Sequence, residues 1–146
     1  MLFLGMYNHS VDSKNRLVLP SKFISKLSES IYISIGFDGC LEIRNEKDFK
    51  EYSEKLLELP NTSRDARQIQ RVFLSLSSKV EVDGSKRVLV PVNLLQKASI
   101  DKDVMIIGVG KTIEIWNKTK FEAYSKEAES KYEEAAERVS NNEHNK

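Results

Sequence analysis

The chain has 146 residues, of which 40% are hydrophobic and 31% are charged, and its net charge is +1. This length and composition predict a folded chain of one or two small domains, and the near-neutral charge excludes a uniformly basic nucleic-acid binder. The one cysteine, Cys40, excludes an internal disulfide and a cysteine-cluster metal site.

The first predicted elements in chain order form a hairpin. Residues 5–11 (GMYNHSV) favour a strand, the residues from Asp12 to Arg16 its turn, and residues 16–20 (RLVLP) a returning strand that ends at Pro20. A helical turn (SKFISKL) and two β-rich stretches (IYISIG and CLEI) follow. A helix then begins at Asn45, whose side chain is suited to cap it.

The same order of elements then repeats. The segment DGSKRVLVP at 83–91 matches DSKNRLVLP at 12–20 under a shift of 71 residues. The segment IEIWNKTKFEAYS at 113–125 matches LEIRNEKDFKEYS at 41–53 under a shift of 72, and Asn117 takes the place of Asn45 as the expected cap. Two similar blocks in the same order, at a nearly constant distance, indicate an internal duplication.

Duplication also predicts the fold. The four short strands of one copy cannot bury both faces alone, so we expect two copies to close over a shared core as a small β-barrel, mainly β with flanking α-helices. The predicted divisions are a first repeat at 1–60, a linker helix at 61–77, a second repeat with its C-terminal helix at 78–139, and a polar tail at 140–146. Apolar stripes on the linker and last helices either contact another subunit or pack on the same chain.

The two repeated turns carry the candidate site. Residues 9–26 hold four cations against one carboxylate, and residues 79–97 hold four against two. A turn aspartate accepts hydrogen bonds from backbone amides and can orient the arginine. An ordered arginine on a two-stranded ribbon can read guanine in the major groove, while lysines reach phosphates. The candidate DNA-binding residues are Asp12, Lys14, Arg16, Asp83, Lys86 and Arg87. The alternative is an ordinary Asp–Arg salt bridge that closes each hairpin.

The opening FLGMYNHSVDSKNRLVLPSKF resembles the start of the MraZ family of bacterial transcriptional regulators, and VDGSKRVLVP resembles its second copy. The resemblance extends to about Tyr132. It implies an AbrB-like fold, a barrel of swapped β-hairpins with two repeats per chain. It also implies a ring-shaped homo-oligomer, often octameric, that binds double-stranded DNA at short direct repeats upstream of its own operon in the cell-division and cell-wall gene cluster, and thus a nucleoid association.

The resemblance also carries roles to single residues. In the first copy it covers Asp12, Lys14 and Arg16, and in the second Asp83 and Arg87. The second copy departs from the pattern, because Ser85 stands where the first copy has Lys14 and its lysine has moved to Lys86. We therefore expect the first turn to contribute more to binding.

Other activities find little support. His9 and His144 are far apart in sequence and predict no metal site, and Cys40 lacks an activating base. The glycines lack phosphate-loop spacing, so we expect no enzyme, catalytic residue, metal or cofactor. No apolar run could cross a bilayer and no signal peptide is evident, so we expect a cytoplasmic protein with no membrane partner. The rival function is a protein-interaction module, an antitoxin-like partner binder whose helices dock another protein.

Overall fold

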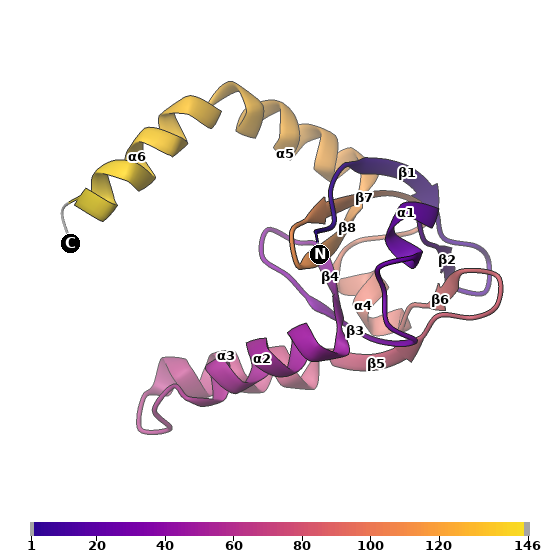
Figure 1. Cartoon of the computed structure of the whole chain (residues 1–146), viewed down its shortest axis with the longest axis horizontal. Coiled ribbons are helices and arrows are strands. Elements are labelled where there is room, and N and C mark those ends of the chain that lie inside the picture. The colour runs from indigo at the N-terminus through magenta and orange to yellow at the C-terminus, as the bar shows by residue number, and fades with distance from the viewer. Residues whose placement is uncertain (1, 145–146) are drawn as a thin grey trace.

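The computed structural model describes residues 2–144, which form a strand-rich body with two helical arms (Figure 1). The strands are β1 (Met6–Ser10), β2 (Arg16–Val18), β3 (Ser30–Ile35), β4 (Leu41–Asn45), β5 (Ser77–Glu81), β6 (Arg87–Leu89), β7 (Asp103–Val109) and β8 (Thr112–Asn117). The helices are α1 (Ser21–Ile24), α2 (Glu46–Leu57), α3 (Arg64–Ser75), α4 (Val92–Lys97), α5 (Lys118–Ser130) and α6 (Tyr132–His144). The predicted β-rich fold with flanking helices is confirmed.

Strands from the two copies interleave in one antiparallel sheet. Its order is β1-β7-β8-β4-β3-β5, and three of its pairs join the copies: β1 with β7, β4 with β8, and β3 with β5. The remaining strands, β2 and β6, pair with each other in a separate two-stranded ribbon, called here the ribbon. Each copy therefore completes its strand pairing on the other.

The closed barrel expected from the sequence is not formed by this sheet. Strands β1 and β5 are its two edges and do not pair with each other in the described structure. Strands β2 and β6, which leave the two turns, are only three residues long. Pro20 and Pro91 follow closely after them and cannot donate to a ladder. The ribbon is therefore too short to extend the sheet into a closed hydrogen-bonded cylinder.

A single apolar cluster fills the space that the sheet and ribbon share. Side chains alternate in direction along each strand, and the inward set comes from both copies. Fully buried members include Leu17 and Val88 from the ribbon, Ile31, Ile43, Ile106 and Ile115 from the sheet, and Phe23 and Leu94 from the short helices. This is the shared core that the duplication predicted.

The helical arms differ in how they contact the body. Helices α2 and α3 lie side by side, with the Phe49 and Phe73 rings 5.8 Å apart, and α5 packs through Phe121, 5.5 Å from Trp116. Helix α6 projects away from the body (Figure 1), and the described side chains from Tyr132 onward are exposed. Packing on the same chain therefore buries the phenylalanines of α2, α3 and α5, but it leaves other apolar residues of these helices, such as Ile69, and those of α6 exposed.

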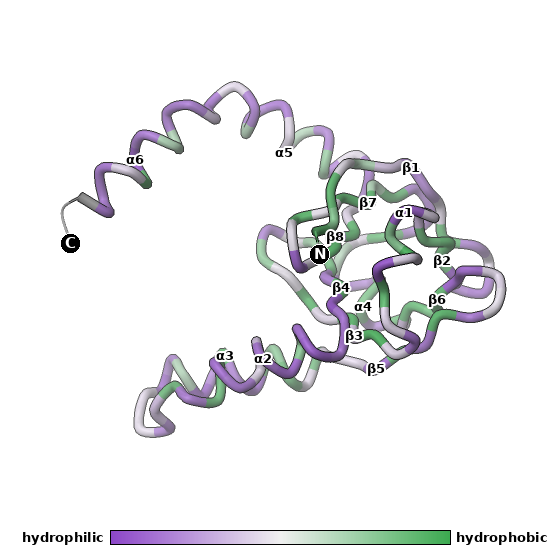
Figure 2. The backbone as a smooth tube through the Cα atoms, in the orientation of Figure 1, coloured by the Kyte–Doolittle hydropathy of each residue, from purple (hydrophilic) through white to green (hydrophobic). Residues whose placement is uncertain are grey.

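The stretch predicted as a polar tail begins inside a helix. Helix α6 continues to His144, so residues 140–144 are helical, and residues 145 and 146 lie outside the described range. This stretch contains no glycine or proline to stop a helix. Colouring by hydropathy shows apolar positions interspersed with polar ones along α6 (Figure 2).

Candidate nucleic-acid interface

The first tip, residues 12–16, is organised by one carboxylate. Asp12 Oδ1 accepts hydrogen bonds from the backbone amides of Lys14 at 2.8 Å and Arg16 at 2.9 Å. Its Oδ2 accepts from Arg16 Nε at 2.8 Å. Among residues 2–144 the two terminal nitrogens of this guanidinium have no hydrogen-bonded protein partner. Arg16 is therefore held through Nε, and its terminal nitrogens remain available as donors.

The second tip, residues 83–87, repeats this geometry. Asp83 Oδ1 accepts from the amides of Ser85 at 2.8 Å and Arg87 at 2.9 Å, and its Oδ2 accepts from Arg87 Nε at 3.0 Å. The replacement of a lysine by Ser85 leaves the frame unchanged, since only the backbone amide at that position is used. The two tips differ in where their lysine lies, not in how their arginine is held.

Each tip contains one residue with a left-handed backbone. Asn15 has φ 63° and Lys86 has φ 64°. Asparagine adopts this region readily, whereas for lysine it carries a steric cost. The other copy supports both residues, because the carbonyl of Asn15 accepts from Val90 N at 2.9 Å and that of Lys86 accepts from Leu19 N at 3.0 Å.

The ribbon brings the two arginines onto one surface. Arg16 lies opposite Leu89, and Val18 lies opposite Arg87. The residues between them, Leu17 and Val88, point into the core. Because directions alternate along a strand, both arginines share the outer face as diagonal neighbours, roughly 7–8 Å apart by ordinary sheet geometry. Pairing between the copies therefore places the arginines of both tips on one surface, and no local pattern in the sequence indicates this pairing.

The charge state of the tips follows from the same contacts. The amide of Arg16 lowers the pKa of Asp12, and the guanidinium adds to this effect. The amide of Arg87 lowers the pKa of Asp83 in the same way. Both carboxylates are therefore ionised at neutral pH and each is matched by its arginine. Lys14 and Lys86 are exposed and form no salt bridge within residues 2–144, so they leave an excess of positive charge.

Neither Cys40 nor His9 is part of the two tips. Burial, with the nearby charges of Glu114 and Glu42, raises the pKa of the Cys40 thiol to about 12, so it is no nucleophile at neutral pH. Burial lowers the pKa of His9.

Within residues 2–144 no cluster of three or more acidic, histidine or cysteine side chains is arranged to hold a metal ion. No helix in the same range has the length and apolar character needed to span a membrane.

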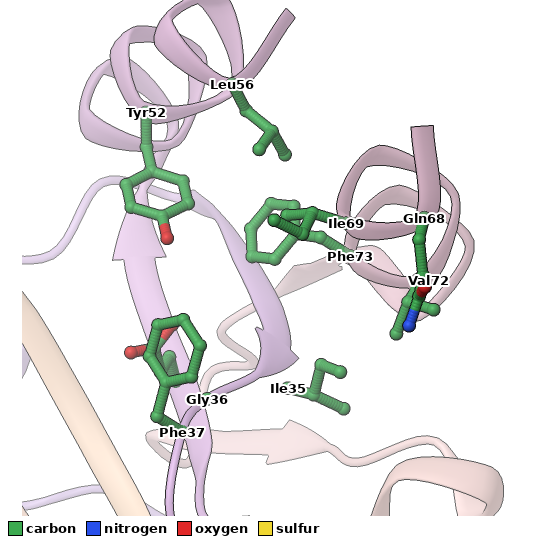
Figure 3. Close-up of a pocket in the computed structure, with 10 residues that line it drawn as sticks. Ile35, Gly36, Phe37, Tyr52, Leu56, Gln68, Ile69, Val72 and Phe73 are labelled. Carbon is green, nitrogen blue, oxygen red and sulfur yellow. The ribbon is translucent and has the colours of Figure 1, made fainter. Parts of the chain in front are cut away.

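An apolar hollow of about 210 Å³ lies between the β3–β4 hairpin and helices α2 and α3 (Figure 3). Its walls are formed mostly by aliphatic and aromatic side chains, including Phe37, Ile69 and Val72. Glu42 is its one carboxylate, and it is already paired with Arg44 at 2.9 Å. The hollow therefore offers surface for apolar contact rather than groups for acid–base or nucleophilic chemistry.

These features define an internally duplicated, β-rich protein that presents two arginines, each held by an aspartate, on one ribbon. The family described as "MraZ protein, putative antitoxin-like" matches the chain twice, over residues 2–72 and 73–142. The chain belongs to the MraZ family, and the two matches agree with the internal duplication.

Individual relatives support the same assignment, and each is named transcriptional regulator MraZ. The protein of Clostridium tetani is 44% identical, with 95% of this chain and 97% of that protein covered. The protein of Ureaplasma urealyticum is 41% identical, with 94% and 97% covered. The protein of Caldanaerobacter subterraneus is 41% identical, with 96% and 98% covered. These names confirm the prediction that the chain is not an enzyme.

Proposed function

We propose that this chain is a sequence-specific DNA-binding transcriptional regulator whose ribbon enters the major groove. The observation that carries the proposal is the pair of arginines, each held through Nε by an aspartate, on one outer face. A two-stranded ribbon fits the major groove, and a guanidinium with free terminal nitrogens can donate to guanine O6 and N7 together. Because its aspartate already holds each arginine in place, neither arginine has to lose conformational freedom when DNA binds.

The six residues of the site then take three roles. Arg16 and Arg87 read bases, Asp12 and Asp83 hold them in position, and Lys14 and Lys86 neutralise phosphates. An Asp–Arg clasp alone would also close the hairpins. What favours the DNA-binding role is that both clasps face outward on one ribbon, with exposed lysines beside them.

The proposal extends to assembly and target. Tyr132 and Val139 of α6 are 74% and 61% exposed, an amount of apolar surface that a contact with further copies would cover. We propose a ring-shaped homo-oligomer, an octamer as the family resemblance implies, which displays several ribbons at once. Linked ribbons raise the effective concentration for each successive site, and same-facing ribbons favour direct repeats. The proposed target is such repeats upstream of the protein's own operon in the cell-division and cell-wall cluster, in the nucleoid.

Footprinting on DNA just upstream of the protein's own gene tests this function. The parent should protect repeated short segments, and Arg16→Ala should lose them. Arg71→Ala, which removes the same charge from an exposed position on α3, is the matched control and should keep the footprint. An unchanged footprint with Arg16→Ala and Arg87→Ala combined would refute base reading by the ribbon.

A second candidate, the protein-interaction module, is favoured by the apolar hollow, where Ile69 and Val72 are 49% and 44% exposed. If a partner protein docks there, Val72→Glu should abolish regulation in cells while leaving DNA affinity intact. If regulation follows DNA affinity alone in Val72→Glu and Arg16→Ala, the module is excluded.

A further inference from the structure

We propose that Val18 and Leu89 are specificity residues, which contact thymine methyl groups in the major groove beside the base contacts of the two arginines. This inference rests on the proposed function, because it requires the outer face of the ribbon to meet DNA. It adds a second kind of base recognition, apolar rather than polar, at residues outside the Asp–Arg motif.

The placement of these two side chains carries the argument. Val18 is 42% exposed and Leu89 is 60% exposed, although both lie in strands whose neighbouring residues are buried. They occupy equivalent positions in the two copies, since they are separated by the same shift of 71 residues that relates Arg16 to Arg87. An exposed aliphatic residue therefore stands at the same place in both tips.

Each aliphatic residue lies directly opposite an arginine. Leu89 pairs with Arg16 and Val18 pairs with Arg87, and facing side chains of an antiparallel pair have Cβ atoms about 4.5–5.5 Å apart. If the arginine of each pair is close enough to DNA to contact a base, the aliphatic residue opposite it also reaches the floor of the groove. The thymine C5-methyl is the apolar group that the major groove displays.

Charge identifies DNA as the occupant of this apolar patch. Two cations, Arg16 and Arg87, lie directly opposite the aliphatic residues, and two more, Lys14 and Lys86, lie exposed in the same tips. The two aspartates are engaged by their arginines, so the face as a whole is positive. A positive face with a small apolar centre matches a phosphate-lined groove with methyl groups on its floor, and it does not match an apolar protein surface.

The test removes methyl groups from each side in turn. A duplex is selected by the wild-type protein from a random-sequence pool and then remade with deoxyuridine in place of each thymine, one at a time. At the contacted thymines the wild-type protein should bind about three- to fourfold more weakly, the factor expected for one buried methyl group. The variant Val18→Ala/Leu89→Ala should bind the thymine duplex more weakly and show no further loss with deoxyuridine at those thymines.

Two further variants separate recognition from folding. Val18→Thr keeps the β-branched shape that suits a strand but exchanges one methyl for a hydroxyl, and it should lose part of the thymine preference without a change in thermal stability. Val109→Ala is the matched control. Val109 is 50% exposed at the end of β7 remote from the tips, because Ser10, beside the first tip, pairs with Asp103 at the other end. It should bind as the parent does.

The possible outcomes are distinct for the two proposals. If the wild-type protein selects no sequence, the proposed function fails. If it selects a sequence that depends on Arg16, but every deoxyuridine duplex binds equally to the parent and to Val18→Ala/Leu89→Ala, the thymine contacts are refuted while the function stands. If that variant loses binding only because the oligomer dissociates in light scattering, the two residues belong to a protein interface and the inference is likewise refuted.

Discussion

Glu42 and Glu114 lie directly opposite each other in the antiparallel pair of β4 and β8, where the two copies join. Glu42 Oε1 accepts from Arg44 Nη1 at 2.9 Å, while Glu114 Oε1 accepts from Trp116 Nε1 at 3.0 Å. Burial raises the pKa of Glu114, and the charges of Glu42 and Asp38 add to the increase. The joint between the copies therefore contains facing carboxylates that are not both matched by a cation.

Glu114→Gln should stabilise the fold at neutral pH. The folded-state pKa of Glu114 lies above its ordinary value, so in the pH window between the two the folded chain binds more protons and stability falls as pH rises. Glutamine keeps the oxygen that accepts from Trp116 but carries no charge. We expect the melting temperature of Glu114→Gln at pH 7 to be higher than that of the parent, and its fall with rising pH above the ordinary glutamate pKa to flatten. Glu122→Gln on the exposed face of α5 is the control. A lower melting temperature for Glu114→Gln at pH 7 would contradict the argument.

Substitutions at Asp12 and Arg16 should impair binding in different ways. Arg16→Ala should cost about 1–3 kcal/mol per base contact and erase sequence preference, with thermal melting unchanged because the side chain lies on an outer face. Asp12→Ala should weaken binding while some preference survives, since the arginine remains but is less ordered. Asp12→Asn can still accept from the two backbone amides, so the loss of DNA affinity in this variant reports the hydrogen bond to Arg16 Nε alone. Titrations against selected and scrambled DNA measure each. If Arg16→Ala binds DNA as tightly as the parent does, the Asp–Arg pair serves only to close the hairpin.

The lysines should determine salt dependence. Log affinity should fall linearly with log salt, and Lys14→Ala should make the slope shallower by about 1 while leaving the preferred sequence unchanged. Lys86→Ala should do the same, because both lysines are exposed at their tips. Titrations at several salt concentrations measure the slope, and an affinity independent of salt would exclude phosphate contacts.

The second tip should tolerate conversion to the first tip's pattern. The double substitution Ser85→Lys/Lys86→Asn keeps the net charge and places asparagine, in place of lysine, at φ 64°. Relief of the left-handed strain should add up to about 1 kcal/mol of stability, and DNA affinity should be equal to or above that of the parent. Chemical denaturation and titration measure the two effects. A loss of stability would mean that Lys86 makes contacts that compensate for its backbone.

Self-association should depend on α6. Light scattering should give a mass well above the 16.7 kDa of one chain, and Val139→Asp, which places a charge in the exposed apolar positions of α6, should reduce it. Arg138→Gln is the neighbouring control. A parent mass near that of one chain would remove the multivalent part of the mechanism.

Local patterns were sufficient to predict the tips and most strands, because turn chemistry and alternation are properties of neighbouring residues. They were less reliable where distant groups compete. Asn117 Oδ1 accepts from Lys120 N at 3.1 Å, as an N-cap should. Asn45 occupies the equivalent place but accepts from Ser28 N at 2.8 Å and donates to the Lys26 carbonyl at 2.9 Å, so it ties down a loop instead.

The candidate site shows the same division. The Asp–Arg hydrogen bonds span four residues and are encoded locally. The pairing of β2 with β6 joins residues about 70 positions apart. Whether a strand pairs within its own copy or with the other copy depends on two opposing factors. Loop-closure entropy disfavours the distant partner, and burial in the shared core favours it. The convergence of two tips into one ribbon therefore became visible only in the folded chain.

The interleaving of β1 with β7 and of β3 with β5 has a consequence for how the molecule is built up. Neither repeat in the sequence is a folding unit in space, because each would leave edge strands and the inner face of its half-ribbon uncovered. A chain cleaved in the turn between α2 and α3 should stay together as two entwined fragments. If either fragment is made alone, two copies of it should associate. The fused chain is thus equivalent to a permanently tethered dimer, in which each tip is free to diverge from its counterpart.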